Sequence, residues 1–479
     1  MTTQTEVLSP AIARVTLAVA IAATVVLSMM GASIWLLAAL VAVAVFFALF
    51  PVSQYLLTAY FGLLAAFAYF LSDFPVSTGF FKLYGSDLVV PFFAWGVMRL
   101  ALAHRRGELL IPTYTRLPLL LVCLFGAYGT VHVCYSLVVM DLPLDGVFGY
   151  FRRLVLYSLV VLLPTLLDIK PKHVEILGKV VVSAGVFLVL MGIYRVTFGA
   201  YVRYDEDNPT GYIGVRLYRL SEVVVLAAAV AYATVAIRTR ERISAKLFYF
   251  GLIAMCVPLM AICGYRLGIL YAVAAPIVAE TFRMYIGREN VLGLLRAAIV
   301  VAILFIAAVG LGWLLFRDSV EQTRRDIMVR QQTISTTGEW RYWSGVHAIK
   351  TWKENPMLGA GLGHRLNFPF RGSEGTFVFA DSSVHNFALE LLYMLGLVGS
   401  SLYAAFTGAI LFVVFGRIRA IDARWRPHVV SLLILYAFML GVALLQPLDV
   451  SGFVLLHLSL GLVFRFAQFP QESAASAVV

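Results

Sequence analysis

The sequence predicts an all-α polytopic membrane protein with about 12–14 transmembrane helices and one long loop that carries short helices. Hydrophobic residues make up 61% of its 479 residues and charged residues only 13%. The mean hydropathy is +0.89, and apolar runs of about 20 residues, the length that crosses a bilayer, recur along the chain. Because charged residues make up about a quarter of an ordinary soluble domain, this composition excludes a soluble globular protein.

The apolar runs start close to the N-terminus. The first follows Arg14 without a convincing cleavage site, so we expect a membrane anchor there and not a cleaved signal peptide. The first two runs are closely spaced, so their division into two spans is open and the predicted count is about 12–14. The predicted spans lie near 15–31, 33–50, 54–72, 83–103, 118–139, 151–167, 175–198, 221–237, 247–263, 267–282, 297–316, 397–416, 428–446 and 451–467.

The net charge of +11 reflects membrane topology. Positive residues gather in alternate loops, as the positive-inside rule requires, so we expect these loops and both termini to be cytoplasmic and no nucleic acid to be bound. The loops contain Arg105 and Arg106, Lys170 and Lys172, Arg238, Arg240 and Arg242, Arg283 and Arg288, and Arg417, Arg419, Arg424 and Arg426.

The same alternation places three segments on the outer side of the membrane: 199–220, 264–266 and 317–384. The last is predicted to be a loop inserted between transmembrane helices of a single integral membrane domain that covers residues 1–479. All four cysteines lie in apolar spans, so we interpret them as small buried hydrophobic residues and expect neither a disulfide nor a metal site.

The stretch 339–399 carries the densest set of motifs in the chain. Aromatic and aliphatic residues at helical spacing, with charged residues on the other face, predict an amphipathic helix half-buried at a membrane interface. Thr336 and Glu339 have the spacing of a capping box at its start. Asn355-Pro356 is expected to end it.

A glycine-rich turn and a histidine follow this helix. The turn contains Gly359, Gly361 and Gly363, whose backbone could approach a ligand closely, although glycines also simply turn chains. Asp381, Ser382 and Ser383 are candidate N-caps, which would place His385 in the first turn of the next helix. The helix dipole disfavours an imidazolium there, so we expect a neutral, proton-accepting His385.

Three arginines on the outer side are candidate anion-binding residues because they run against the charge rule. Arg266 lies in a short turn between two spans, where an ionisable side chain is costly enough to indicate function. Its structural alternative is to snorkel to lipid headgroups or to pair with an acid such as Glu222. Arg216 and Arg219 are alternatives for one role, and each could also be an ordinary interfacial charge.

Other charged residues allow two interpretations each. Asp205-Glu206-Asp207 has the DxD form that holds a divalent cation against a diphosphate, but an acidic solvated loop has the same composition. Arg152 and Arg153 could extend an anion site or meet lipid phosphates. Asp87, in the predicted span 83–103, could pair with a neighbouring helix or lie near a membrane interface.

The order of the motifs resembles the O-antigen ligase and O-antigen polymerase family. The residues that carry the resemblance are Arg341, Trp343, Asn355-Pro356, Gly359, Gly361, His385-Asn386, Leu389, Gly396 and Gly399. The resemblance implies a GT-C-type glycosyltransferase in the bacterial inner membrane. Such an enzyme moves a glycan from undecaprenyl diphosphate to an acceptor sugar on the periplasmic side and needs no metal ion or other cofactor.

The resemblance also implies roles for particular residues. His385 would be the general base that deprotonates the acceptor hydroxyl, and Arg266 with Arg216 or Arg219 would hold the diphosphate. The sequence after Arg219 departs from the family's arginine-glycine pattern, so the choice between Arg216 and Arg219 stays open. The remaining residues expected to bind substrate are Arg341, Asn386 and His364.

Three functions share these features. An O-antigen ligase would use the sugar of a lipid A core as acceptor, and a polymerase would use another lipid-linked glycan. A flippase for a lipid-linked oligosaccharide would also need many spans and cationic groups, but it predicts charges near the bilayer midplane and interrupted helices related by a repeat. The polar residues gather instead at the outer ends of the spans, which favours a transferase over a flippase. The motifs are shared by ligases and polymerases and do not separate the two; we take the ligase as the first hypothesis and the polymerase as its alternative.

Overall fold

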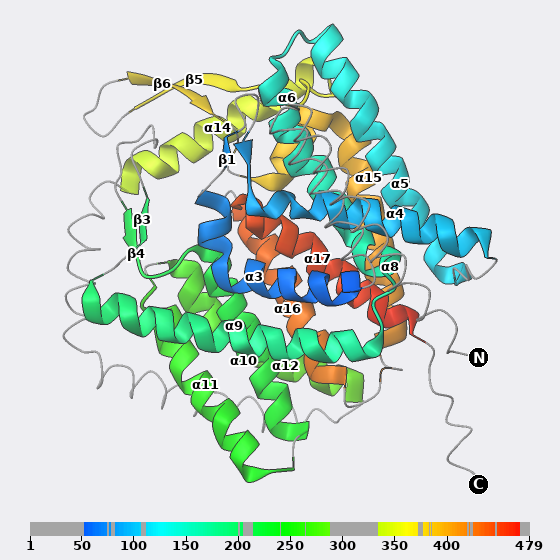
Figure 1. Ribbon diagram of the computed structural model, residues 1–479. Coiled ribbons are helices and arrows are strands. Elements are labelled where there is room, and N and C mark those ends of the chain that lie inside the picture. The colour runs from blue at the N-terminus through cyan, green and yellow to red at the C-terminus, as the bar shows by residue number, and fades with distance from the viewer. Residues whose placement is uncertain are drawn as a thin grey trace, which may run out of the picture.

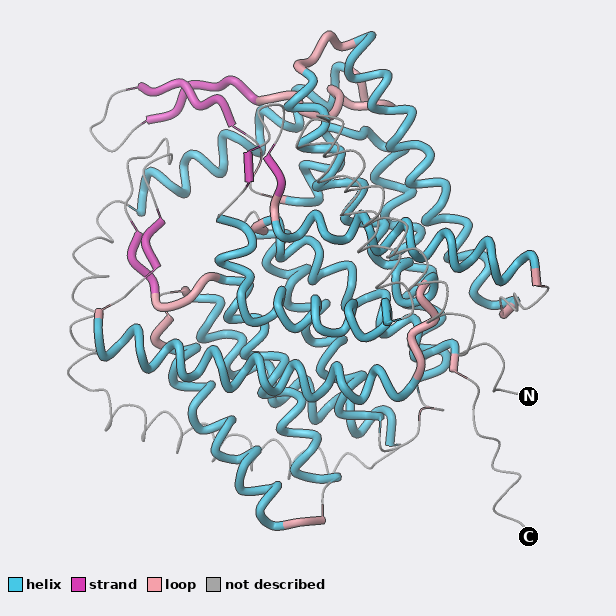
Figure 2. Tube along the Cα trace, in the orientation of Figure 1, coloured by secondary structure: helices cyan, strands magenta, loops and turns pink. Residues whose placement is uncertain are grey.

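A computed structural model describes residues 52–73, 76–77, 82–106, 112–199, 202–204, 214–239, 241–263, 265–287, 334–371, 377–382, 384, 386–418, 421, 425–445 and 448–469 (Figure 2). Within these residues the fold is helical apart from three short antiparallel hairpins. The predicted all-α polytopic class is therefore confirmed.

The elements follow one another along the chain without a separate soluble unit among the described residues. The helices are α3 Ser53–Asp73, η2 Gly85–Leu88, α4 Val89–Arg105, α5 Thr113–Cys134, η3 Tyr135–Val139, α6 Leu144–Tyr150, η4 Phe151–Leu156, α7 Tyr157–Leu159, η5 Val160–Leu162, α8 Leu163–Leu166, α9 Pro171–Phe198, α10 Leu220–Thr239, α11 Ile243–Ala261, α12 Arg266–Gly287, α14 Ile334–Glu354, α15 Phe387–Arg417, α16 Arg426–Leu445 and α17 Val450–Gln468. The strands are β1 Val76–Ser77, β2 Lys82–Leu83, β3 Val202–Tyr204, β4 Gly214–Arg216, β5 Leu366–Arg371 and β6 Phe377–Ser382.

Ten helices of the described part are long and apolar enough to cross a membrane, so the chain is a multi-pass membrane protein. Each coincides with a predicted span, from Gly85–Arg105 through Val450–Gln468. The predicted span 54–72 is helical as α3. The predicted spans 15–31, 33–50 and 297–316 lie outside the described residues, so the total count stays a prediction.

The helices form a bundle with α10 and α17 at its centre (Figure 1). In both of these helices 89% of the most apolar window is buried, against 28% in α4 and α5. Exposed aliphatic and aromatic side chains cover the peripheral helices, among them Val138, Ile243 and Phe412. Such a surface is suited to contact with lipid. Two cysteines expected to be buried, Cys123 and Cys134, are exposed on α5, because a lipid-facing helix side is open in the isolated chain.

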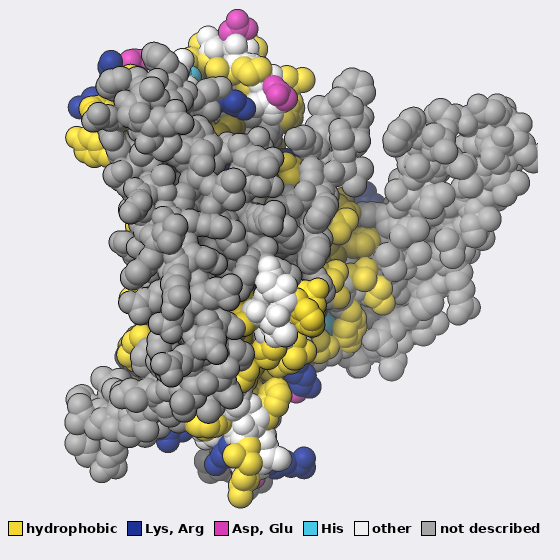
Figure 3. Space-filling model, turned by 90° about the vertical axis from the view of Figure 1, so that its left-hand side faces the viewer, with side chains coloured by type: hydrophobic (Ala, Val, Ile, Leu, Met, Phe, Trp, Pro, Cys, Tyr) yellow, Lys and Arg dark blue, Asp and Glu magenta, His cyan; other side chains and the backbone are white. Residues whose placement is uncertain are grey.

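Hairpins β3–β4 and β5–β6 and helix α14 lie along the left and upper left of the bundle in Figure 1, and we call this the hairpin end. Figure 3 views this side and shows hydrophobic side chains next to charged ones that gather at its top and bottom. Hairpin β5–β6 pairs Leu366 with Ser382 and Arg371 with Phe377. The sequence analysis did not predict this hairpin within the loop 317–384.

Two predicted helix starts are wrong. Helix α14 begins at Ile334, so Thr336 and Glu339 lie inside it, although it ends at Glu354 as expected before Asn355-Pro356. The predicted caps Asp381 and Ser382 belong to strand β6.

Helix α15 is capped instead by Asn386, whose side chain accepts a hydrogen bond of 3.0 Å from the Leu389 N–H. Helix α15 therefore begins at Phe387, after His385 in the sequence. His385 itself lies outside the described residues. The predicted start of this helix is therefore wrong, and the expectation of a neutral, proton-accepting His385 stays a prediction.

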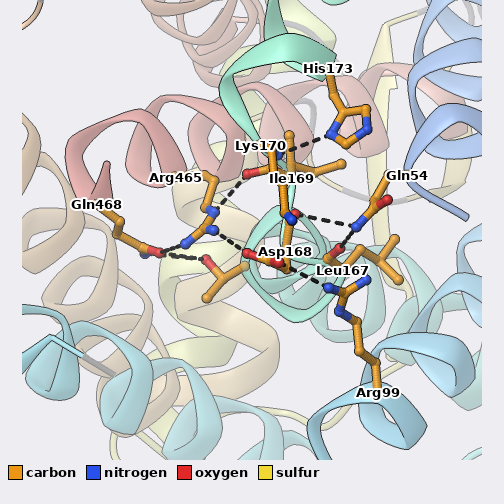
Figure 4. Close-up of polar contacts among 10 residues, drawn as sticks. Gln54, Arg99, Leu167, Asp168, Ile169, Lys170, His173, Arg465 and Gln468 are labelled. Carbon is orange, nitrogen blue, oxygen red and sulfur yellow. Dashed lines mark hydrogen bonds and ion pairs between the residues drawn. The ribbon is translucent and has the colours of Figure 1, made fainter. Parts of the chain in front are cut away.

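A polar network ties three elements together at the end of the bundle opposite the hairpins (Figure 4). Asp168, in the turn between α8 and α9, pairs with Arg99 of α4 at 2.9 Å and with Arg465 of α17. Arg465 Nε also donates to the Ile169 carbonyl at 2.9 Å. Asp168 has a φ of +52°, so the ion pairs hold a backbone conformation that non-glycine residues rarely adopt.

The network predicts a stability difference between two matched glycine variants. Asp141 also has a positive φ, of +49°, but makes no ion pair among the described residues. Asp141→Gly should leave the thermal stability in detergent unchanged or slightly higher, because glycine relieves backbone strain. Asp168→Gly should lower it by about 1–2 kcal/mol, because two partly exposed ion pairs are lost. Equal melting temperatures for both variants would contradict this role of Asp168.

Candidate functional site

The glycine-rich turn, residues 355–364, exchanges backbone hydrogen bonds with a broken helix. Helix α15 is interrupted at Gly396, which has φ +66° and ψ −170°. In a continuous helix Leu397 and Val398 would donate to the carbonyls of Tyr393 and Met394. Those carbonyls accept instead from Ala360 (2.7 Å) and Gly361 (3.1 Å), while Leu397 and Val398 donate to Pro356 (2.9 Å) and Met357 (3.2 Å). The turn thus supplies four bonds where the helix loses two.

Glycine is required because the two backbones approach each other closely. Gly359, Gly361 and Gly363 have φ values of +76°, +95° and +85°. A Cβ on Gly359 would lie 2.6 Å from the Gly396 nitrogen, and a Cβ on Gly363 would lie 2.7 Å from the Gly146 carbonyl carbon. The close approach expected for a ligand is therefore taken up by the protein's own backbone.

Helix α5 and the π-helical turn η3 hold this glycine turn from the other side. The Leu362 N–H donates to Ser136 Oγ at 2.8 Å. The imidazole of His132 lies 2.7 Å from the Leu358 carbonyl through Nε2, and the Asn355 side chain donates to the Tyr135 hydroxyl. Motif residues 355–361 are therefore fixed against a helix that lies more than 200 residues earlier in the chain.

Two arginines of the π-helical turn η4 pair with acids from other elements. Arg152 Nη1 lies 3.1 Å from Asp87 Oδ2, which confirms the expectation that Asp87 pairs with a neighbouring helix. Arg153 pairs with Glu390 in the first part of α15. π-Helical turns are frequent at functional sites, because they displace side chains from their regular helical positions. Both arginines are thus compensated by acids within the protein.

A second charged cluster joins α9, α10 and the start of α17. Arg195 Nη1 lies 3.0 Å from Glu222 Oε2, and both side chains are buried. Glu222 also accepts from the backbone N–H of Arg219 at 2.8 Å. Asp449 accepts from Ser221 Oγ at 2.9 Å. Burial raises the pKa of Asp449, while the positive charge of Arg219 and the hydrogen bond from Ser221 act in the opposite direction.

His364 ends the glycine turn next to this backbone exchange. Its carbonyl accepts a hydrogen bond of 3.1 Å from the Tyr393 hydroxyl. Its Nδ1 atom is buried and has no hydrogen-bond partner among the described residues. Burial lowers the pKa of His364, and the charge of Glu354 partly opposes this effect. The imidazole is therefore biased to its neutral form, which can accept a hydrogen bond or a proton.

The structure brings some of the predicted site residues together. His364 contacts the first part of α15 through Tyr393, and Asn386 caps the start of the same helix and donates from Nδ2 to the Leu444 carbonyl at 2.7 Å. Arg219 belongs to the cluster around Glu222 and Asp449. Arg341 lies on the exposed surface of α14.

The remaining predicted residues are located by their backbone only or not at all. Arg216 ends strand β4 and Arg266 begins helix α12, but their side chains are not described. Glu222, the acid suggested as a partner for Arg266, pairs instead with Arg195. Because His385 lies outside the described residues, the roles that the resemblance implies for His385 and Arg266 stay predictions.

The sequence analysis missed three charged residues of these clusters: Arg195, Glu390 and Asp449. Each interrupts an otherwise apolar run, and an ionisable residue in such a run is a signal for a buried partner. The identity of each partner depends on contacts across 27 residues or more, so no local pattern gives it.

The described residues contain no group of three His, Cys, Asp or Glu side chains placed to hold a metal ion. The alternative cation site, Asp205-Glu206-Asp207, lies outside them. No protein-family model and no curated protein matches this sequence. The resemblance to the O-antigen ligase family therefore rests on the motif residues alone.

The backbone exchange predicts opposite outcomes for two glycines of α15. A Cβ at Gly396 would clash with the Met357 carbonyl. The backbone conformation at this position is also one that essentially only glycine adopts, so alanine would be strained there. Gly396→Ala should therefore cost at least about 3 kcal/mol and leave little folded protein after purification. Gly416, in the same helix, has no atom within 4 Å of an added Cβ. Gly416→Ala should keep or raise the melting temperature by the helix propensity of alanine. A wild-type melting temperature for Gly396→Ala would contradict the exchange.

The half-buried imidazole of His364 predicts a pH dependence. Its native pKa lies below the ordinary value of 6.5, so the unfolded state binds more protons as the solution becomes acidic. The stability from neutral His364 is complete above pH 6.5 and is lost as the pH falls toward the native pKa. The melting temperature should therefore decrease from pH 7.5 to pH 5, and less so in His364→Gln, with a difference of at most about 1.4 kcal/mol per pH unit. Parallel pH profiles of the two proteins would disprove this role.

Proposed function

We propose that this chain is an inverting glycosyltransferase of the O-antigen ligase type. It would transfer a glycan from undecaprenyl diphosphate to a sugar of the lipid A core, on the periplasmic side of a bacterial inner membrane, in lipopolysaccharide biosynthesis. The observation that carries the proposal is the convergence of motif residues. Asn355, Gly359 and Gly361 meet Gly396 at one junction, and Asn386 and Leu389 form the cap of the same helix.

The proposed chemistry assigns separate tasks to cationic and basic groups. The acceptor hydroxyl attacks the anomeric carbon, the bond from this carbon to the diphosphate oxygen breaks, and undecaprenyl diphosphate leaves. His385 takes the proton of the hydroxyl. Arg266, with Arg216 or Arg219, stabilises the negative charge that develops on the diphosphate. Direct displacement without a protein nucleophile inverts the anomeric carbon, and the mechanism uses no metal ion.

The architecture supports a site at the hairpin end. Both charged clusters lie at helix ends that connect to hairpins or to the glycine turn: Arg195 near the end of α9, Glu222 at the start of α10, and Glu390 at the start of α15. The loop arginines Arg216 and Arg266 belong to the same set of connections by chain order. A lipid-linked diphosphate lies at the membrane surface, so helix ends are where its charges would be met.

A transporter for a lipid-linked oligosaccharide is the second candidate, and the interrupted helix α15 favours it. Broken helices in transporters leave backbone groups free to bind substrate. In α15 the carbonyls of Tyr393 and Met394 and the N–H groups of Leu397 and Val398 are all bonded to the glycine turn. The break therefore leaves no free backbone groups of this kind for a transported substrate, and it does not by itself distinguish a transferase from a transporter. A polymerase has the same chemistry as a ligase with another lipid-linked glycan as acceptor.

The test is glycan transfer by purified protein from a synthetic undecaprenyl diphosphate carrier to a lipid A core acceptor, with and without EDTA. We expect transfer that survives EDTA and falls by at least about 100-fold in His385→Ala and in Arg266→Ala, because each removes a group used in the transition state. Gly416→Ala is the matched folded control, since it lies on α15 with open space around an added Cβ.

The other outcomes separate the alternatives. Extension of the carrier glycan without transfer to the core would identify a polymerase. Carrier movement across liposomes without either transfer would identify a transporter and refute the proposal. Transfer that EDTA abolishes and a divalent cation restores would refute the metal-free mechanism.

A further inference from the structure

The ion pair between Arg153 and Glu390 joins three helical segments at the hairpin end. Arg153 lies in the π-helical turn η4 and Glu390 in the first part of α15. The Arg153 guanidinium also lies 5.0 Å from the centre of the Tyr150 ring and 5.4 Å from that of Phe453 in α17. Only 2% of the Glu390 side chain is exposed, so its carboxylate is removed from solvent.

A buried pair of this kind is a weak source of stability. Removing two charges from water costs several kcal/mol, and hydrophobic residues of similar volume often stabilise a protein as well or better. The pair does constrain geometry, because the charge-assisted contact between Arg153 Nη2 and the Glu390 carboxylate ties η4 to the first part of α15. The role of the ion pair is therefore to orient the segments that it joins.

The group that it orients is the first part of α15, residues 387–395. Asn386 binds this segment to the Leu444 carbonyl at the end of α16, at 2.7 Å. The Tyr393 hydroxyl binds it to the His364 carbonyl at 3.1 Å. Glu390 lies between these two ties and connects the segment to η4. Because the helix is broken at Gly396, the segment is not a straight continuation of the rest of α15. Backbone bonds from Ala360 and Gly361 hold its last residues, and the side chains of Asn386 and Glu390 hold its start.

We propose that the Arg153–Glu390 pair is a positioning device that aligns the first part of α15 for glycosyl transfer. This inference rests on the proposed function, since Asn386 and the preceding His385 are residues to which that function assigns binding and proton transfer. Neither Arg153 nor Glu390 takes part in the chemical step. Each acts through the direction of the segment that carries Asn386.

The test measures kcat, the KM for the lipid-linked donor, and the melting temperature in Glu390→Gln, Arg153→Lys and the double variant Arg153→Met/Glu390→Met. Positioning predicts that all three lower kcat by tenfold or more and change the donor KM by less than twofold. The pH profile should keep its shape, because the base itself is intact. Glu390→Asp, which retains the charge, should recover part of the kcat.

The double variant separates positioning from stability. Two methionines fill the buried space without charges, so its melting temperature should equal or exceed that of Glu390→Gln. A folded double variant with wild-type kcat would overturn the proposal and leave the pair a structural element.

Glu280→Gln is the matched control. Glu280 is also a buried glutamate paired with an arginine, Arg283 at 2.7 Å, but it lies near the far end of α12. Its kcat should be unchanged, and a loss equal to that of Glu390→Gln would also overturn the proposal. An inactive wild type would refute the proposed function and the inference with it. An active wild type with active pair variants would refute the inference alone.

Discussion

The structure depends on the need to satisfy every backbone polar group within a membrane. Helix α15 departs from regular geometry at Gly396, and the bonds that it loses are replaced by bonds to residues 356–361. This exchange fixes the position of the glycine turn, because four bonds of defined direction leave it no freedom to slide. The glycine turn also fixes the position of His364. It contacts η3, which directly follows α5, and it contacts α6. One interrupted helix thereby connects the long loop to the bundle.

Charged side chains inside the bundle also need partners within the protein. At the hairpin end, Arg152, Arg153 and Arg195 each have a carboxylate partner. A carboxylate beside each guanidinium offsets much of the cost of burial, and it also lowers the attraction for an incoming anion. An anionic substrate would therefore be met first by arginines on the connecting segments and not by those in the helix interiors. Among the arginines on the connecting segments, Arg219 also lies near a carboxylate, that of Asp449, so its charge is partly compensated as well.

Hydropathy was sufficient to predict the spans, because the length of an apolar run is a local property. The cap of α15 was not predicted: Asp381 and Ser382 have suitable side chains, but pairing with β5 takes them into a strand, and Asn386 caps the helix instead. The break at Gly396 and the partners of Arg153 and Arg195 depend on contacts between distant segments, which a linear pattern does not encode. The glycine motif was located from the sequence, which left open whether its backbone approaches a ligand or only turns the chain; in the structure it approaches the backbone of α15.

This difference bears on what the motif means. Gly359, Gly361 and Gly396 are explained by backbone packing, so they describe a scaffold and carry no chemistry of their own. A ligase, a polymerase and a transporter could each be built on such a scaffold, and side chains near it must decide between them. The bonded state of the break argues against its direct use in binding a substrate. What remains to specify function is the set of arginines on the connecting segments and the histidines at either side of the junction.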